Sequence, residues 1–136
     1  RPSLKQFELF KKYLNFKHDK SEMNEMNYSD YKKMMEAPGV ETKIYEYYYK
    51  KELVACVISD FLDDSISMVY SFYSKEILKN SLGMYMILDH FELAKNLNKN
   101  YVYLGYWVEG CNKMDYKSKF NSSEVLINNK WQHHLI

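Results

Sequence analysis

The spacing of hydrophobic side chains along the 136-residue chain predicts helices at its front. Leu4, Phe7 and Leu14 recur at helical spacing, which indicates a first helix over residues 4–17. A second, shorter helix is expected over 29–36, where a Pro-Gly pair follows and ends it. The pattern then changes to the shorter period that is typical of strands.

Three strand-like runs cover residues 42–49, 53–61 and 66–73, and short polar joints between them predict an antiparallel meander. A long amphipathic helix is expected over 81–97, followed by a strand over 101–108. A helical crossover of this kind makes the strand at 101–108 parallel to the strand at 66–73. The positions expected to face inward from the long helix are Leu82, Tyr85, Met86, Leu88 or Asp89, Leu93 and Leu97.

The last part of the chain adds a short helix over 113–120 and a strand pair within 123–131. Helices should therefore cover both faces of a mixed sheet, which is an α/β (α+β) architecture. Without internal repeats or a low-complexity linker, residues 1–136 are interpreted as one domain. The succession of elements resembles the acyl-CoA N-acyltransferase fold with its first strand missing upstream.

Composition narrows the class of protein. Hydrophobic residues make up 46% and charged residues 27%, which is typical of a soluble globular protein. A net charge of +1 does not favour a protein that coats nucleic acid. Cys56 and Cys111 lie far apart and indicate neither a metal-binding pair nor a disulfide framework, so we expect the cytoplasm. No apolar run approaches membrane-spanning length, and no membrane partner is expected.

The stretch YVYLGYWVEGCNKMDYKSKF, residues 101–120, carries the most unusual pattern. Tyr103, Gly105 and Trp107 share one face of the predicted strand, and glycine inside a strand often marks a bulge or the close approach of a ligand. In the helix that follows, Lys113 and Lys117 lie on one face beside Tyr116. An anion between them would remove their repulsion, although the pattern by itself slightly favours a solvated basic face.

That stretch resembles the most characteristic segment of the protein aminoacyltransferases, which comprise eukaryotic arginyl-tRNA–protein transferases and bacterial aspartate/glutamate leucyltransferases. Further segments match in order: FKKYLNFKH, VISDFLDDSISMVYSFY, SLGMYMILDHFELAK and NNKW. The resemblance covers only the C-terminal, acyltransferase-like half of the family. Its cysteine-rich N-terminal half, with a metal or iron–sulfur site, has no counterpart here, so no cofactor is expected in this chain. Asn121-Ser122 departs from the family's usual basic residue and proline.

The resemblance implies transfer of an amino acid from aminoacyl-tRNA to the α-amine of proteins with N-terminal Asp or Glu, a step of the N-degron (N-end rule) degradation pathway. GYWVEG followed by KMDYK is closer to the bacterial leucyl type, whereas Cys111 resembles the eukaryotic form. Leucine is therefore expected, and arginine stays the alternative. The catalytic candidates are Asp60, which holds the ammonium or serves as base, Tyr73, near the expected oxyanion contact at 71–73, and Tyr103. The candidates for substrate binding are Tyr106 and Trp107, which together with Tyr103 would stack the terminal adenosine, and Gly105, which leaves a notch for a flat or elongated ligand. For the acceptor carboxylate the candidates are Lys113 or Lys117, with Tyr116 beside them and His18 behind them.

Two other classes of function stay open. One is a small-molecule N-acyltransferase that uses acyl-CoA, although the segment YSKEILKNSLG has a single glycine where a CoA-binding loop is usually glycine-rich. The other is a non-catalytic fragment that binds RNA or peptide. Structural roles also remain open for Asp60 in a turn and for His18 at a helix end.

Overall fold

The computed structural model describes residues 1–17, 26–36, 39–74, 79–105, 124–127 and 130–133. The chain divides into two units, Arg1–Tyr103 and Leu104–Ile136, and each is described by itself. The interpretation of residues 1–136 as one domain stays a prediction.

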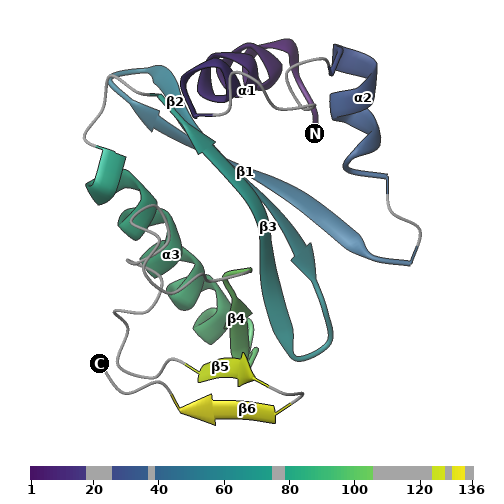
Figure 1. Ribbon diagram of the computed structural model, residues 1–136, viewed down its shortest axis with the longest axis vertical. Coiled ribbons are helices and arrows are strands. Elements are labelled where there is room, and N and C mark those ends of the chain that lie inside the picture. The colour runs from purple at the N-terminus through teal and green to yellow at the C-terminus, as the bar shows by residue number, and fades with distance from the viewer. Residues whose placement is uncertain (18–25, 37–38, 75–78, 106–123, 128–129, 134–136) are drawn as a thin grey trace. The chain divides into compact units, whose positions relative to one another are not determined.

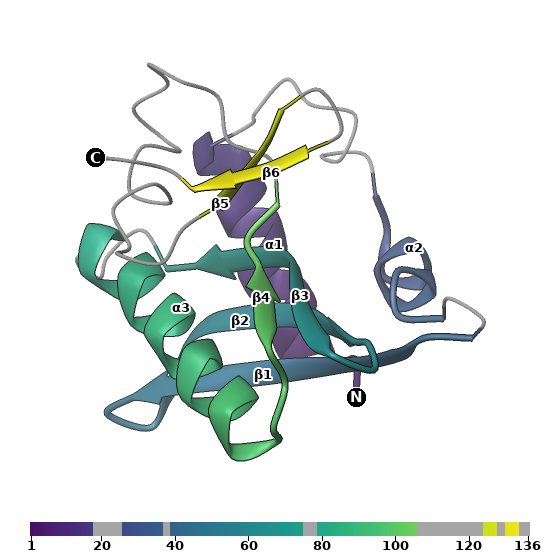
Figure 2. The same ribbon diagram turned by 90° about the horizontal axis from the view of Figure 1, so that it is seen from below.

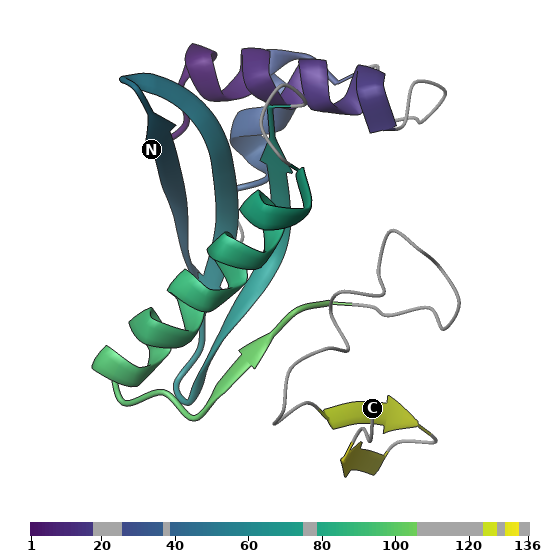
Figure 3. The ribbon, with the colours of Figure 1, turned by 90° about the vertical axis from the view of Figure 1, so that its left-hand side faces the viewer.

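The first unit contains a four-stranded sheet in the order β1-β2-β3-β4 (Figure 1). Its strands are β1 (Glu41–Tyr49), β2 (Glu52–Phe61), β3 (Ser65–Tyr73) and β4 (Tyr101–Tyr103). The first three pair antiparallel, and β4 pairs parallel to β3. The predicted meander and the parallel crossover are therefore confirmed. Figure 3 shows how α3 leads through a tight connection into β4, which runs beside β3.

Helices lie on both faces of this sheet, as the sequence predicts. Helix α1 (Leu4–Lys17) and helix α2 (Tyr28–Lys33) lie on one side, and helix α3 (Lys79–Asn96) lies on the other (Figures 1 and 2). The mixed α+β content is thereby confirmed, and the closer likeness to the acyl-CoA N-acyltransferase fold stays a prediction. Helix α2 ends at Lys33 rather than at Glu36, because Met34 serves as its C-cap.

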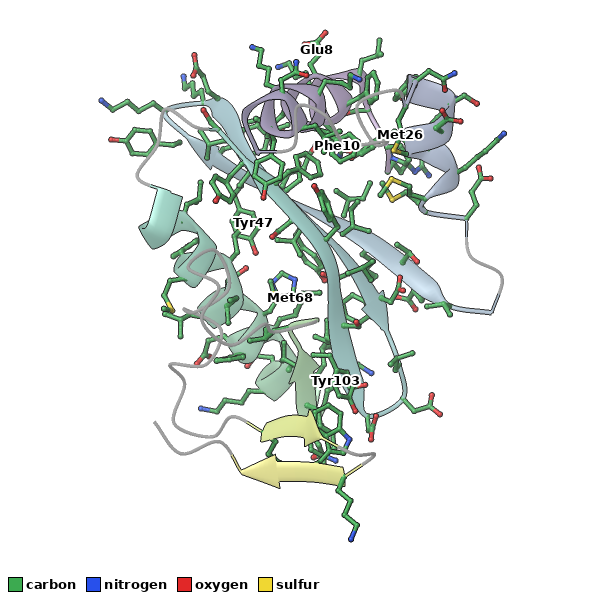
Figure 4. All side chains as sticks on the ribbon, viewed as in Figure 1. Glu8, Phe10, Met26, Tyr47, Met68 and Tyr103 are labelled. Carbon is green, nitrogen blue, oxygen red and sulfur yellow. The ribbon has the colours of Figure 1, made fainter. Side chains whose placement is uncertain are left out.

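An aromatic core fills the space between α1, α2 and the sheet. Phe10 is fully buried under α1, and its ring packs edge-on against Phe72 and tilted against Tyr31, at centroid distances of 5.2 and 5.5 Å (Figure 4). Such aromatic pairs add about 0.5–1.5 kcal/mol beyond the burial of their area. The buried members of this cluster are Leu9, Phe10, Leu14, Tyr31, Cys56, Ile58 and Phe72. This cluster fixes α1 over one half of the sheet.

Gln6 is a buried polar residue inside that core, and its amide is fully hydrogen-bonded. Its Oε1 accepts from the hydroxyl of Tyr31 at 2.9 Å and from the backbone N–H of Ser3 at 3.2 Å. Its Nε2 donates to Oε2 of Glu46 at 2.8 Å and to the carbonyl of Arg1 at 3.0 Å. Because both sides of the amide have partners, its burial carries no penalty for an unmade hydrogen bond.

Helix α3 faces the sheet with a stripe that matches the predicted one only in part, since Met86 is buried as predicted. Its buried residues are Met86, Ile87, His90 and Ala94. Tyr85, Leu88 and Leu97 are exposed to 57%, 48% and 47%, so their predicted inward orientation was wrong. The helix carries apolar residues around most of its circumference, so the hydrophobic pattern alone does not define its buried face. The side chains that fit against the sheet define that face.

The end of α3 directs the chain into β4. Asn98 adopts a left-handed conformation with φ of 56°, and the N–H of Lys99 bonds the carbonyl of Ala94 at 2.8 Å, which is a Schellman cap. The Nζ of Lys99 then donates to the carbonyl of Leu62 at 2.5 Å, in the turn between β2 and β3. These bonds place β4 alongside the start of β3.

Strand β4 is shorter than the sequence suggests. It ends at Tyr103, and Gly105 lies two residues beyond it, exposed and with φ of 88°. Gly105 is therefore not inside the strand, and its positive φ gives a backbone reason for glycine. Residues 106–108 of the predicted strand and the predicted helix at 113–120 lie outside the described residues. In the second unit, β5 (Glu124–Ile127) and β6 (Lys130–His133) pair antiparallel, which confirms the last strand pair.

Candidate functional site

A row of polar side chains crosses the whole sheet on the face that also carries α1. Thr42 of β1 pairs with Asp60 of β2, Asp60 pairs with Ser67 of β3, and Ser67 pairs with Tyr103 of β4. Directly opposed residues project from the same face of a sheet. We call these four residues the polar row. Three adjacent strands thus carry a polar residue at the same register position, although the centre of the sheet is apolar. This row is the candidate site.

The polar row lies beyond the part of the face that the helices cover. The core under α1 and α2 includes Ile58 of β2, two residues before Asp60, with Ile44 and Tyr70 packed against it. All four members of the polar row are partly exposed, whereas Cys56 and Ile58 are buried. The row is thus partly exposed to solvent and lies next to the buried core of the sheet.

Asp60 supplies the negative charge of the row. The hydroxyl of Thr42 donates a 2.6 Å hydrogen bond to its Oδ1. Within the part of the chain that the structure describes, no cation forms an ion pair with Asp60. The nearby Lys43 of β1 instead pairs with Glu41 of the same strand, with 3.3 Å between Nζ and Oε1. The row therefore presents an oriented carboxylate, which suits a positively charged group such as an ammonium ion.

Tyr103, the member of the polar row on β4, stacks on a neighbouring tyrosine of the same strand. Tyr101 and Tyr103 project from the same face, and their rings stack with centroids 6.3 Å apart and planes 22° apart. Tyr101 is 50% exposed, and Tyr103 is partly exposed. Parallel rings at a sheet surface suit the stacking of a flat ligand such as a nucleobase. Asp60 and Tyr103 are separated by two strand spacings, about 10 Å.

The structure does not bring Tyr73 to this row. Tyr73 lies six residues beyond Ser67 on β3, which corresponds to about 20 Å along a strand. Its ring packs edge-on against Tyr13 of α1 at 5.1 Å, and burial raises the pKa of its hydroxyl. Of the three predicted catalytic residues, Asp60 and Tyr103 therefore share one site, and Tyr73 lies in a different part of the sheet.

Most of the predicted substrate-binding residues cannot be placed. Gly105 belongs to the second unit, just past β4. The others lie outside the described residues: His18, Tyr106, Trp107, Lys113, Tyr116 and Lys117. Their roles stay predictions.

Sequence reasoning missed Thr42, Ser67 and His90. The first two acquire significance only from strand register, because each is an ordinary polar residue in its own strand. His90 sits in the amphipathic pattern of α3, where a lone histidine gives little signal. The structure shows it fully buried and hydrogen-bonded to Ser59, directly before Asp60.

Metal and membrane features can be assessed for the described residues alone. Among these residues, no three His, Cys, Asp or Glu side chains gather as a metal site would require. The described helices include none that is long and apolar enough to cross a membrane.

Comparison with known proteins connects this geometry to a family. The family model described as "Arginine-tRNA-protein transferase, C terminus" matches residues 5–127. Proteins named aspartate/glutamate leucyltransferase are similar over almost the whole chain. The one from Rhizobium leguminosarum bv. trifolii is 41% identical over 97% of this chain and 55% of its own length. The one from Jannaschia sp. is 44% identical over 93% of this chain and 46% of its own length.

A third relative, from Sinorhizobium medicae, is 41% identical over 99% of this chain and 56% of its own length. The chain thus spans about half the length of the curated relatives it matches. The family model covers most of the chain, including both strands that carry Asp60 and Tyr103. The chain belongs to the arginine-tRNA-protein transferase C-terminus family.

Proposed function

We propose that the protein containing this chain is an aminoacyl-tRNA–protein transferase that moves leucine from Leu-tRNA to the α-amine of proteins with N-terminal Asp or Glu. The match of the family model to residues 5–127 carries this proposal. The names of the relatives support it, because each names an acceptor of Asp or Glu and a leucyl group.

The reaction needs positioning more than it needs strong acid–base chemistry. The amine nitrogen attacks the carbonyl carbon of the tRNA ester, a C–N bond forms, and the C–O bond to the terminal ribose breaks. The amine loses a proton, and the released ribose oxygen gains one. An α-amine has a pKa near about 8, so a modest base suffices, and correct placement of the two reactants supplies much of the acceleration.

The polar row offers complementary groups to these two reactants. The acceptor arrives mainly as an ammonium ion, and the carboxylate of Asp60 holds it against the sheet with the help of Thr42. The stacked Tyr101 and Tyr103 hold the adenine of the tRNA end about 10 Å away, at the other side of the row. Ser67 lies between them and offers a hydroxyl to the ester.

Leucine is the transferred residue in this proposal. A leucine side chain needs only an apolar pocket, whereas an arginine side chain needs a desolvated carboxylate to pair with its guanidinium. The relatives named above are leucyltransferases, which favours the simpler pocket.

The metal or iron–sulfur site that the family resemblance implies lies outside this chain in our proposal. Cys56 is fully buried, and burial raises the pKa of its thiol to about 12, so it does not fit a metal-bound thiolate. No step at the polar row uses such a group.

We propose that the product enters the N-degron pathway, in which a new N-terminal leucine marks a protein for degradation, and that the reaction takes place in the cytoplasm. Two cysteines without a disulfide pattern support a reducing compartment. The partners are aminoacyl-tRNA and the acceptor protein.

The test is a transfer assay with the full-length protein. Radiolabelled Leu-tRNA and Arg-tRNA are supplied in parallel to peptides that begin with Asp, Glu or Gly, and acetyl-CoA is supplied as a third donor. We expect transfer from Leu-tRNA to the Asp and Glu peptides. Clear preference for Arg-tRNA would overturn the leucine assignment, and transfer from acetyl-CoA alone would favour a small-molecule type of N-acyltransferase.

A further inference from the structure

His90 makes two short hydrogen bonds in a fully buried position between α3 and the sheet. Its Nδ1 lies 2.9 Å from the carbonyl oxygen of Met86, one turn earlier in α3. Its Nε2 lies 2.8 Å from Oγ of Ser59 on β2. The ring of Tyr45 on β1 packs edge-on against the imidazole at 5.2 Å. The imidazole therefore joins the helix to two strands.

The partners of the ring decide where its proton lies. A carbonyl oxygen accepts hydrogen bonds and cannot donate, so Nδ1 carries the proton. Nε2 then has a free lone pair, and the hydroxyl of Ser59 donates to it. A second proton on Nε2 would reverse this bond, so that Oγ of Ser59 accepts, and would place a cation in the core.

The surroundings of the ring also favour the neutral form. Burial lowers the pKa of His90, and the Met86 carbonyl and the carboxylate of Asp89 only partly oppose this. Asp89 is engaged elsewhere, since it accepts a 2.6 Å hydrogen bond from the hydroxyl of Tyr47. On β1, Lys43 contacts Glu41 and the ring of Phe61.

The bond between His90 and Ser59 lies at an irregular place in the sheet. Ile58 pairs with Tyr70, but the next residue, Ser59, pairs with Met68, so Val69 is an extra residue on β3. A bulge of this kind interrupts the ladder and increases the local twist. Asp60 follows at once, and its side chain projects from the opposite face to that of Ser59.

We propose that His90 is a positioning residue, which pins β2 to α3 at the bulge and thereby fixes the place of Asp60 in the polar row. This rests on the proposed function only in so far as Asp60 holds the acceptor ammonium. The pinning itself depends on the hydrogen bonds and the bulge alone.

The first test observes the imidazole in the intact, unmodified protein. Nitrogen-15 NMR of the histidine rings, assigned with a His90→Gln variant, reports which ring nitrogen carries the proton. We expect protonated Nδ1 and unprotonated Nε2 in the folded protein at neutral pH. A ring that carries its proton on Nε2 there, or on both nitrogens, would overturn the proposal.

The second test removes the partner of the ring. In Ser59→Ala, we expect faster amide hydrogen exchange over residues 58–61 and a KM for an Asp-ended peptide that is about two- to tenfold higher, which corresponds to one net hydrogen bond. Affinity for Leu-tRNA should stay unchanged. Ser29→Ala, at an exposed position of α2, is the matched control and should behave like the unmodified protein.

Two outcomes separate this proposal from the proposed function. Faster exchange with an unchanged KM in Ser59→Ala, while Asp60→Asn raises the KM, shows that the pinning does not position Asp60 and overturns the proposal. If Asp60→Asn leaves the KM unchanged, the proposed role of Asp60 fails. The pinning of β2 is then tested by amide hydrogen exchange in Ser59→Ala and by the nitrogen-15 spectrum of the His90 ring. Faster exchange over residues 58–61 supports the pinning, and unchanged exchange overturns it.

Discussion

The hydroxyl of Thr42 donates a 2.6 Å hydrogen bond to Oδ1 of Asp60, across the pair of strands β1 and β2. The bond restricts the rotation of the carboxylate. An oriented carboxylate on a rigid sheet holds an ammonium with less loss of side-chain entropy than a mobile one. Thr42 is thus part of the site although it bears no charge.

Replacing the hydroxyl of Thr42 tests this orientation. Thr42→Val keeps the shape and the strand preference of threonine, and we expect the KM for an Asp-ended peptide to rise about two- to tenfold, the equivalent of one net hydrogen bond. Thr42→Ser keeps the hydroxyl and should remain close to the unmodified protein. Equal KM values for the two variants would show that the hydrogen bond does not matter for acceptor binding.

Lys113 and Lys117 carry a second prediction, which comes from the sequence. If they bind the acceptor's side-chain carboxylate, changing either to methionine should cost about 1.5–3 kcal/mol in kcat/KM for Asp- and Glu-ended peptides, the range for a hydrogen bond to a charged group. Affinity for tRNA should be spared. A fall in tRNA affinity, with a salt dependence that flattens by about one log unit per lysine, would instead assign them to phosphates. Normal transfer at unchanged tRNA affinity would identify a solvated face.

Cys56 provides a test of the core. Its thiol is fully buried, and burial raises its pKa to about 12, so almost no thiolate forms at pH 8. In a Cys111→Ser background, we expect Cys56 to resist iodoacetamide in the folded protein and to react at the rate of unfolding. Rapid alkylation in native buffer would contradict the packing of β2 against α1, and a urea-unfolded sample serves as the positive control.

The turn between β1 and β2 offers a substitution that should stabilise the protein. Lys50 and Lys51 both have positive φ, 49° and 68°, which a type I′ turn requires and which lysine tolerates poorly. Replacing the pair by Asn-Gly should raise the free energy of unfolding by about 1 kcal/mol, measured by urea denaturation. The double variant Lys50→Ala/Lys51→Ala removes the same two charges but keeps both Cβ atoms, and it should give no gain. An equal gain in the alanine variant would point to charge rather than backbone strain.

The sequence predicted the order of elements up to β4, the parallel crossover and the helices on both faces, because hydrophobic period and connection length determine these features. It could not select the inner stripe of α3. Tyr85 and Leu88 are apolar enough for the core, yet Ile87 and His90 are the residues that fit the sheet.

The candidate site was predictable only in part. Asp60 and Tyr103 were identified singly, but their common row depends on register across four strands, which includes an extra residue at Val69. Tyr73 was grouped with them because the fold resemblance places an oxyanion contact at residues 71–73, and six residues along β3 separate it from Ser67. Gly105 was interpreted as part of a strand, since its left-handed conformation cannot be deduced from the aromatic residues around it.

The most direct test is the kcat/KM of Asp60→Asn for an Asp-ended peptide, measured in the full-length protein with saturating Leu-tRNA. Asparagine keeps the size of the side chain and can still accept from Thr42, but it loses the charge. We predict that kcat/KM falls about ten- to one-hundredfold, the equivalent of a hydrogen bond between charged groups, while the affinity for Leu-tRNA is unchanged. Transfer to the Asp-ended peptide with the kcat/KM of the unmodified protein would contradict the claim that Asp60 holds the acceptor's ammonium.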